Sequence, residues 1–238
     1  MNARFDIQIG GAYPPVASVG IVLRDRLDDP VPGKYTICYV NAFQTQEQEA
    51  NYWRGEHPDL LLKDSSGEYV SDPDWRGEYL LDTSTPARRK GIATIVDGWT
   101  GDCARRGFQA IEFDNLDSWT RSGDRLSPAD NVALATLLVA HPHANGLAAA
   151  QHNAADLGTA GKDEAKMDFA IAEECQRYGE CTTYLSAYGN HVVEVEYTDN
   201  PRSAYVTACA AQGRKISVAL RDREVVPAGE KGYHYEVC

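Results

Sequence analysis

Carboxylate side chains recur directly after short apolar runs of this sequence, and they are the groups best placed to do chemistry. Each run is typical of a buried strand, and parallel strands of a closed barrel all end on one face. We therefore expect these acids to gather around one cleft. They are Asp25, Asp82, Asp114, Asp117, Glu173, Glu174, Glu196 and Asp222.

Two carboxylates that face each other across a cleft can cleave a glycosidic bond. One donates a proton to the departing oxygen, and the other attacks the anomeric carbon or activates water. Asp114 and Glu173 form the best pair, because each directly follows a short apolar strand and one predicted strand separates theirs. Glu112 shares the strand parity of Asp114 and would lie deeper. There it either raises the pKa of a neighbour by repulsion or forms a buried salt bridge with Arg24 or Arg221.

Other motifs give weaker signals. His141 and His143 resemble the His-x-His pair of metal-dependent barrel hydrolases, but they fall at the end of a predicted helix, which favours a surface role. The chain has no Gly-x-Ser-x-Gly motif and no zinc-like cysteine spacing, so we expect no cofactor and no metal. Oxygen ligation of Mg²⁺ or Ca²⁺ by the same acids stays open as an alternative. Gln151, His152 and Asn153 either bind sugar hydroxyls or cap the next segment.

These side chains need strands and helices to position them, and the sequence alternates between the two. Thr85-Pro86 predicts a helix start and Gly107 its end, and Ser127-Pro128 opens a second helix that ends near Gly146. The predicted strands are 5–9, 19–23, 35–40, 79–81, 110–113, 147–150, 169–172, 192–197 and 216–220.

This alternation predicts an α/β fold, a (β/α)8 TIM-type barrel that forms one domain over 1–238. Nine candidate strands are one too many for eight units. The segment between 5–9 and 19–23 is too short and proline-rich for a crossover helix, so one accessory strand is expected near the N-terminus. Residues 44–77 are irregular and form either a short helix with a loop or an excursion on the binding face.

The composition excludes several classes of protein. The 238 residues are 43% hydrophobic and carry a formal net charge of −12, which disfavours nucleic acid and anionic membranes as partners. No apolar run is long enough for a membrane-spanning helix. The negative charge is compatible with a cationic substrate, and we expect a monomer.

Six cysteines without metal-ligand spacing indicate disulfides and a secreted, extracellular protein. No signal peptide is visible in this chain. A bridge between Cys175 and Cys181 would be local, and a bridge from Cys209 would hold Cys238 at the end of the chain. Cys38 and Cys103 either form a third pair or remain free thiols.

Four segments of the sequence resemble a known family over nearly the whole chain. They are FDIQIGGAYPP at 5–15, ICYVNAF at 37–43, EFDNLD at 112–117 and FAIAEEC at 169–175. They are similar to glycoside hydrolase family 114, the endo-α-1,4-polygalactosaminidase family. The resemblance implies a (β/α)8 barrel whose catalytic carboxylates map onto Asp114 and Glu173. The family often has Pro where Phe113 stands and Lys where His152 stands.

The resemblance also implies roles and a substrate. Asp114-Asn115 is similar to the strand-end nucleophile of retaining α-galactosidases, which makes Asp114 the nucleophile and Glu173 the acid/base; the reverse assignment, and Glu174 in place of Glu173, are the alternatives. The implied substrate is a polycationic galactosamine polysaccharide, cleaved internally. A carbohydrate-binding barrel without turnover is the other reading. The expected substrate contacts are Tyr13, Asp25, Tyr39, Asp82, Glu112, Asn115, Asp117, Trp119, Gln151, Glu174, Glu196, Tyr197 and Asp222.

Overall fold

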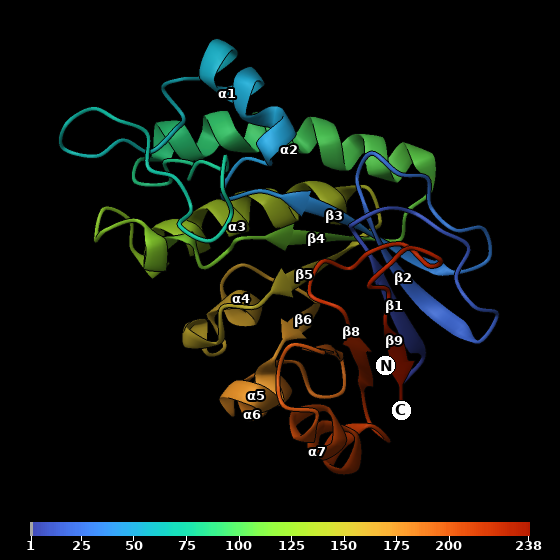
Figure 1. Cartoon of the computed structure of the whole chain (residues 1–238). Coiled ribbons are helices and arrows are strands. Elements are labelled where there is room, and N and C mark those ends of the chain that lie inside the picture. Colours follow the sequence, from blue (N-terminus) through green and yellow to red (C-terminus); the bar gives the residue numbers. More distant parts are fainter. Residues whose placement is uncertain (1) are drawn as a thin grey trace.

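The computed structural model describes residues 2–238 and contains one nine-stranded sheet whose strands follow chain order (Figure 1). The first eight strands are parallel, and only β9 runs antiparallel, against β8. The strands are β1 Arg4–Gln8, β2 Val19–Asp25, β3 Tyr35–Asn41, β4 Ala110–Asp114, β5 Ala148–His152, β6 Phe169–Glu173, β7 Val192–Tyr197, β8 Ser217–Arg221 and β9 Tyr235–Val237. The sheet is a nearly closed barrel, which confirms the predicted fold class.

Helices lie between consecutive strands from β3 to β8. They are α1 Ala50–Glu56, α2 Pro86–Arg106, α3 Pro128–Ala144, α4 Ala160–Asp163, α5 Cys175–Tyr178, α6 Cys181–Tyr188 and α7 Ser203–Gln212, with 3-10 turns at Glu47–Glu49, Ser118–Arg121 and Ala155–Leu157. The links from β1 to β2 and from β2 to β3 contain no helix. The long helices α2 and α3 therefore cover one side of the barrel, whereas β1 and β2 lie apart from the helices (Figure 1).

The predicted helix boundaries follow from capping. The Thr85 hydroxyl accepts the backbone N–H of Arg88 at 3.3 Å, and α2 ends at Gly107, whose φ of 92° lies in the left-handed region that glycine tolerates. Ser127 forms a reciprocal capping box with Asp130 at the start of α3. The Thr-Pro and Ser-Pro signals thus predicted both starts correctly.

Two details of the strand prediction were wrong. The extra strand is not near the N-terminus, because β1 and β2 pair in parallel and both belong to the barrel; it is β9, at the C-terminal end. Residues 79–81 form only isolated bridges, such as Gln44 with Leu80 and Leu61 with Leu81. They belong to the excursion over 44–81. A short apolar run such as 79–81 has the same local pattern in a barrel strand and in an isolated bridge, so the sequence could not distinguish the two.

Side chains of each barrel strand alternate between two hydrophobic layers. The inner layer fills the barrel with residues such as Phe5, Ile37 and Ile171. The outer layer packs against the helices and includes Phe113, on the same strand as the inward Ala110. This alternation decides which strand-end residues reach the mouth of the barrel.

A buried side-chain network joins β8 to β1, where the barrel closes. The guanidinium of Arg221 contacts the Asp6 carboxylate at 3.1 Å and also donates to the carbonyls of Ile7 and Val226. The Tyr13 hydroxyl donates to Asp6 Oδ1 at 2.9 Å. Because the carboxylate has a cation and several donors, this network braces the seam between the first and last parallel strands.

Three disulfides link all six cysteines: Cys38–Cys103, Cys175–Cys181 and Cys209–Cys238. The local bridge and the bridge that holds the C-terminal residue are confirmed, and the remaining two cysteines form the third pair. Such bonds persist in oxidising environments. Within residues 2–238, no helix combines the length and the apolar character needed to cross a bilayer.

Candidate active site

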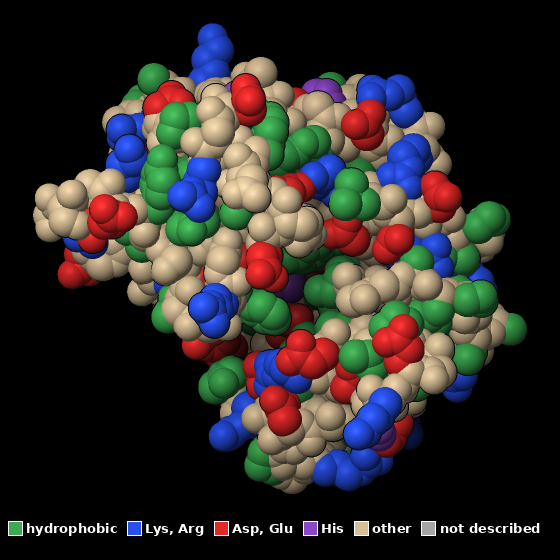
Figure 2. Space-filling view, turned by 45° about the horizontal axis from the view of Figure 1, so that its top comes forward, with side chains coloured by type: hydrophobic (Ala, Val, Ile, Leu, Met, Phe, Trp, Pro, Cys, Tyr) green, Lys and Arg blue, Asp and Glu red, His purple; other side chains and the backbone are tan. Residues whose placement is uncertain are grey.

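A cavity of about 340 Å³ opens at the carboxyl ends of the barrel strands. Figure 2 shows a hollowed face with Asp and Glu side chains gathered around the hollow. The cavity walls come from strand ends and from the 44–81 excursion: Tyr39, Gln46, Asp72, Asp74, Trp75, Glu78, Asp114, Asn115, Asp117, Arg121, His152, Asn153, Glu173, Tyr197 and Arg223, with the segments 9–10 and 224–225.

Five inward side chains from adjacent strands form the floor of this cavity. Tyr39, His152, Glu173 and Tyr197 each lie two residues beyond a residue of the inner layer, and Asp114 lies four beyond Ala110, so strand alternation points all five into the barrel mouth. They come from β3, β4, β5, β6 and β7 in order. The predicted pair of Asp114 and Glu173 is therefore brought to one site by the strands that flank β5.

The buried imidazole of His152 lies between three carboxylates. Nδ1 is 2.6 Å from Glu112 Oε1, and Nε2 is 3.3 Å from Asp114 Oδ1 and 3.6 Å from Glu173 Oε2. Burial alone would lower the pKa of His152, but the charges of these three carboxylates outweigh it and hold the pKa well above the ordinary value of 6.5. His152 is therefore an imidazolium at neutral pH.

Asp114 is held by hydrogen bonds to both oxygens. The Tyr39 hydroxyl donates to Oδ2 at 2.5 Å, and the backbone N–H of Asn115 donates to Oδ1. Burial raises the pKa of Asp114 and repulsion from Glu173 adds to this, while His152 and Tyr39 oppose the rise. The carboxylate is thus fixed in orientation at the edge of the cavity.

Glu173 has a different electrostatic environment. The Tyr197 hydroxyl donates to Oε1, and Asn153 Nδ2 donates to Oε2 at 3.3 Å. Burial would raise its pKa, but the charge and hydrogen bond of His152, with the donors Tyr197 and Asn153, lower the pKa of Glu173 to about 2. Glu173 is therefore ionised at neutral pH in this environment.

Glu112 lies beneath the floor, as its parity predicted, and it is fully buried. Its partner is His152 rather than Arg24 or Arg221, and its Oε2 has no hydrogen-bond partner among residues 2–238. Burial raises the pKa of Glu112 to about 7; His152 opposes this, and Asp114 and Glu173 add to it. Glu112 thus supports the imidazolium from below.

The backbone turns sharply after each of the three central strands. Asn115, Asn153 and Glu174 have φ values of 63°, 47° and 58°, in the left-handed region that costs energy for residues other than glycine. Each follows a floor residue: Asp114, His152 or Glu173. Strain of this kind concentrates where side chains are held for function.

Another wall of the cavity is a network of ion pairs and hydrogen bonds around Arg121 and Glu78. Arg121 contacts Asp72 at 2.8 Å and Asp117 at 3.0 Å, and it donates to Asn115 Oδ1 at 3.1 Å. Glu78 accepts from Gln44 Nε2 at 2.6 Å, and burial raises its pKa to about 7. The 44–81 excursion therefore contributes polar walls, which supports the expectation of an excursion on the binding face.

A second cavity of about 220 Å³ adjoins the first and shares Asp117, Asn153 and Glu173 with it. The predicted contacts Trp119 and Glu174 lie here, and the Glu174 carboxylate accepts from Arg223 Nη1 at 2.8 Å. The remaining lining residues are Thr120, Ala154, Ala155, Asp156, Tyr178, Glu180 and Tyr184.

Four of the expected substrate contacts line neither cavity, because they cap backbone N–H groups. Asp25 accepts from Leu27, Asp82 from Ser84, Asp222 from Val226 and His234, and Glu196 from Gln176 and Arg177. Glu196 also has the opposite strand parity to Tyr197, so both cannot point into the barrel. The structure thus gives these acids local structural contacts rather than a place at the mouth.

Two further expected contacts are turned away from the site. Tyr13 belongs to the seam network with Asp6 and Arg221. Gln151 has the opposite parity to His152. Its Nε2 donates to the Asn153 carbonyl at 2.7 Å, and its Oε1 accepts from the Tyr188 hydroxyl at 2.7 Å. By contrast, the expected contacts Tyr39, Asn115, Asp117 and Tyr197 line the main cavity.

Several cavity residues were not singled out as site residues from the sequence. His152 was left between two readings, although its parity with the inward Ala150 could have placed it in the floor. Trp75, Glu78 and Arg223 reach the cavity through loops, and no local pattern marks them. Arg223 lies 4.1 Å from the Tyr197 ring centre, a contact between two different strand ends.

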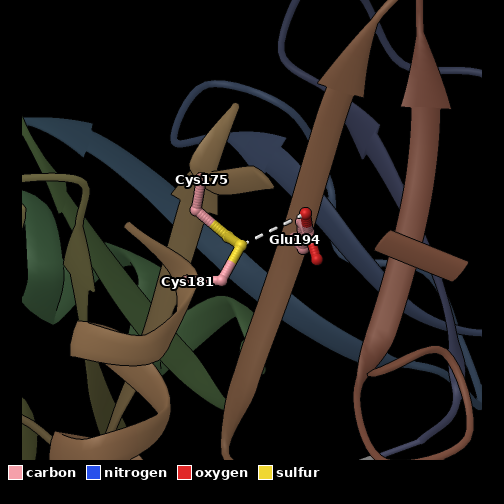
Figure 3. A group of neighbouring side chains, drawn as sticks. All are labelled: Cys175, Cys181 and Glu194. Atoms are coloured by element: carbon pink, nitrogen blue, oxygen red, sulfur yellow. Dashed lines mark hydrogen bonds between the residues drawn. A yellow bond between two sulfur atoms is a disulfide. The ribbon is translucent and has the colours of Figure 1, made fainter. Parts of the chain in front are cut away.

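Among residues 2–238, the side chains grouped closely enough to bind a metal ion are Cys175, Cys181 and Glu194. The two sulfur atoms are bonded to each other, as Figure 3 shows, so they are not free thiolates. The group lies on the outer side of β7, away from the cavity. It does not fit a metal centre in the disulfide-bonded protein.

Comparisons with known proteins agree with this fold. The computed structure is similar to Aspergillus fumigatus Ega3, solved in complex with galactosamine, with a TM-score of 0.79, 20% identity and coverage of 100% of this chain and 95% of the other. It is also similar to the glycoside hydrolase domain of Pseudomonas aeruginosa PelA, with a TM-score of 0.67, 13% identity and coverage of 95% and 96%. These likenesses show the fold.

A search of curated proteins found no match. A family model described as glycoside-hydrolase family GH114 matches residues 1–238. The predicted family is confirmed by this match, which spans the floor residues and both cavities. The chain therefore belongs to glycoside hydrolase family GH114.

Proposed function

We propose that this glycoside hydrolase cleaves α-1,4-linked galactosamine-containing polysaccharide internally and with retention of anomeric configuration. The observation that carries the proposal is the placement of Asp114 and Glu173 on either side of His152 Nε2, at the floor of an open cavity. The linkage and the sugar come from the family resemblance, and the galactosamine bound to Ega3 supports the choice of sugar.

The spacing of the two carboxylates supports retention. Asp114 Oδ1 and Glu173 Oε2 lie 3.3 and 3.6 Å from one nitrogen, so they are no farther apart than those two distances together. Retaining glycosidases hold their carboxyl groups about 5–5.5 Å apart, and inverting ones about 6.5–9.5 Å apart. The upper limit here reaches only the lower edge of the inverting range.

The two cavities support one assignment of roles. Glu173 lines both cavities, whereas Asp114 lines only the larger one. The scissile bond would then lie at the junction, with the attacked sugar beside Asp114 and the departing sugar beyond Glu173. Asp114 attacks the anomeric carbon and forms a glycosyl ester, while Glu173 protonates the departing oxygen. Glu173 then takes a proton from the water that hydrolyses the ester.

This assignment places a requirement on Glu173. Its pKa of about 2 in the surroundings that the protein provides means that it must gain a proton when substrate binds. A sugar oxygen that replaces the Tyr197 or Asn153 donor would remove part of the stabilisation of the carboxylate. In the reverse assignment Asp114, whose pKa is raised, would supply the proton.

Other features support an extracellular amino-sugar polymer as substrate. The formal net charge of −12 favours cationic chains over anionic ones, and three disulfides suit a secreted enzyme. Cavities on both sides of Glu173 leave room for sugar residues in either direction, as internal cleavage requires. Turnover should therefore weaken as salt is added.

The deciding experiment is mass analysis of products from defined α-1,4-galactosamine and N-acetylgalactosamine oligomers, with wild type, Asp114→Asn and Glu173→Gln. We expect each variant to lose about 10³-fold or more in kcat, in line with the loss of one member of a catalytic carboxylate pair. Equal, slow turnover by all three proteins would show that the assigned pair is wrong, and binding without turnover by wild type would favour the non-catalytic carbohydrate-binding barrel.

The same variants separate the two assignments of roles. An oligosaccharide with an activated aryl leaving group needs little protonation of its departing oxygen. With this substrate Glu173→Gln should still form the glycosyl ester, while Asp114→Asn should stay inactive. The opposite result would exchange the roles. Loss of wild-type activity in a chelator would instead support the Mg²⁺ or Ca²⁺ alternative.

A further inference from the structure

We propose that the second cavity binds the sugar on the leaving-group side and selects there for a free amine over an N-acetyl group. The proposal deepens the function proposed above and rests on it. It concerns the pocket beyond Glu173, formed by the ends of β5 and β6, the 3-10 turns at Ser118–Arg121 and Ala155–Leu157, and the start of α6.

The position of this cavity follows from its shared residues. Asp117, Asn153 and Glu173 line both cavities, so the two are continuous at the acid/base carboxylate. A volume of about 220 Å³ is below the range of about 300–1,000 Å³ for drug-sized ligands, so it suits one sugar ring rather than a long chain. A sugar bound here would present its glycosidic oxygen to Glu173.

The charge of the second cavity differs from that of the first. The main cavity is lined by Arg121, Arg223 and His152 together with its acids, whereas no Lys, Arg or His is among the described residues that line the second. Asp117 is paired with Arg121 and Glu174 with Arg223.

Two carboxylates of the second cavity remain uncompensated. Asp156 and Glu180 have no ion-pair partner among residues 2–238. Burial raises the pKa of Glu180, and repulsion from Asp156 raises it further. Burial also raises the pKa of the Tyr184 hydroxyl, to which the charges of Glu180, Asp117 and Asp156 add. A cation in this cavity would relieve that repulsion.

Three aromatic side chains complete the cavity, and they suit an amino sugar. Trp119, Tyr178 and Tyr184 line it, and Tyr178 is 63% exposed at its edge. Ring faces pack against the apolar face of a sugar and attract an ammonium group. A protonated amine therefore gains both a ring contact and two free carboxylates. An N-acetyl group carries no charge, so it would leave Asp156 and Glu180 uncompensated.

The test uses Asp156→Asn, Glu180→Gln and the double variant, with Glu164→Gln as the matched control. Glu164 lies on the exposed surface just after α4, and it lines neither cavity. The substrates are α-1,4-linked oligomers that differ only in whether the residue on the leaving-group side carries a free amine or an N-acetyl group.

We expect KM for the free-amine oligomer to rise about threefold for each single variant and about tenfold for the double variant, with little change in kcat. The control and the N-acetyl oligomer should change by less than about twofold. Unchanged discrimination between the two oligomers in the double variant would overturn the inference. If wild type cleaves neither oligomer, the proposed function fails instead, so the two failures are distinguishable.

Discussion

The inner and outer faces of the barrel each bury carboxylates, but the two groups differ in what surrounds them. The inner group consists of Glu112, Asp114 and Glu173 around His152, at the cavity floor. The outer pair consists of Glu194 and Glu196 on β7, and Glu194 lies beside the Cys175–Cys181 disulfide (Figure 3).

The difference lies in the presence of a cation. The inner group contains the imidazolium of His152, which helps to lower the pKa of Glu173 to about 2. The outer pair has no cationic partner among residues 2–238, and burial raises the pKa of Glu194 to about 8, although the side chain of Gln212 opposes this. Burial alone therefore favours the protonated acid, and a neighbouring charge decides whether a buried carboxylate stays ionised.

The outer pair has structural contacts instead of a cavity. Glu196 Oε1 accepts the N–H groups of Gln176 and Arg177, which begin α5, and Glu194 Oε2 accepts from Gln212 on α7. These bonds tie two helices to the back of β7. The comparison predicts that inner variants affect catalysis, whereas outer variants affect stability.

Among the variants that test this comparison, the largest expected effect is that of His152→Gln. Without the imidazolium, burial and mutual repulsion raise the pKa values of Asp114 and Glu173. We expect kcat/KM at neutral pH to fall by about 100-fold or more, and the acidic limb of its pH profile to move to higher pH. His143→Gln is the matched control, because His143 pairs with Asp168 at 2.8 Å on the surface. If the acidic limb does not move in His152→Gln, the charge of His152 does not control the pKa values of Asp114 and Glu173.

The second effect concerns Glu194→Gln and appears in stability. Burial raises the pKa of Glu194 from 4.5 to about 8 in the folded protein, so the contribution of Glu194 to stability is fully present below pH 4.5 and is lost as pH rises towards 8. Glutamine mimics the protonated acid. We expect the variant's unfolding free energy to exceed that of wild type by on the order of 3 kcal/mol at pH 8.5.

Urea unfolding of both proteins from pH 4.5 to 8.5 measures this difference, and near pH 4.5 it should vanish. Glu164→Gln, with an exposed carboxylate, should show no comparable pH dependence. A constant difference at every pH would mean that Glu194 is not protonated in the fold. The kcat/KM of Glu194→Gln should stay within about twofold of wild type, in contrast to His152→Gln.

The smallest effect is expected for Glu196→Ala. Two backbone N–H groups of α5 lose their acceptor, which should cost about 1–2 kcal/mol of unfolding free energy. KM for cationic oligomers should not change, because Glu196 lies on the outer face. A rise in KM as large as that expected for Glu180→Gln would indicate that Glu196 contacts substrate. It would then contradict the separation of inner, catalytic acids from outer, structural ones.

Much of the candidate site was predictable because strand ends are local signals. Asp114 and Glu173 follow apolar runs that became β4 and β6, and a parallel barrel must bring such positions to one face. Alternation within one strand also placed Glu112 beneath Asp114. The same rule would have excluded Glu196 once Tyr197 was placed inward, since adjacent residues of a strand face opposite sides.

Other features depend on contacts between distant segments. Glu78 and Trp75 reach the cavity through an irregular excursion, and the second cavity combines turns that follow three different strands. The acids that cap backbone N–H groups resemble the proposed catalytic ones in sequence. Only their surroundings distinguish them, and those surroundings come from neighbours far along the chain.

The sequence by itself determined the family, the barrel and the local disulfide, and it predicted the carboxylate pair that the fold brings together, because each depends on short-range patterning or on characteristic segments. The tertiary structure decided which strand-end acids face the cavity, that the extra strand is β9, and that His152 binds three carboxylates. Charge and burial at a site are sums over neighbours from many segments. A linear pattern therefore locates a carboxylate, but only the fold sets its protonation and its use.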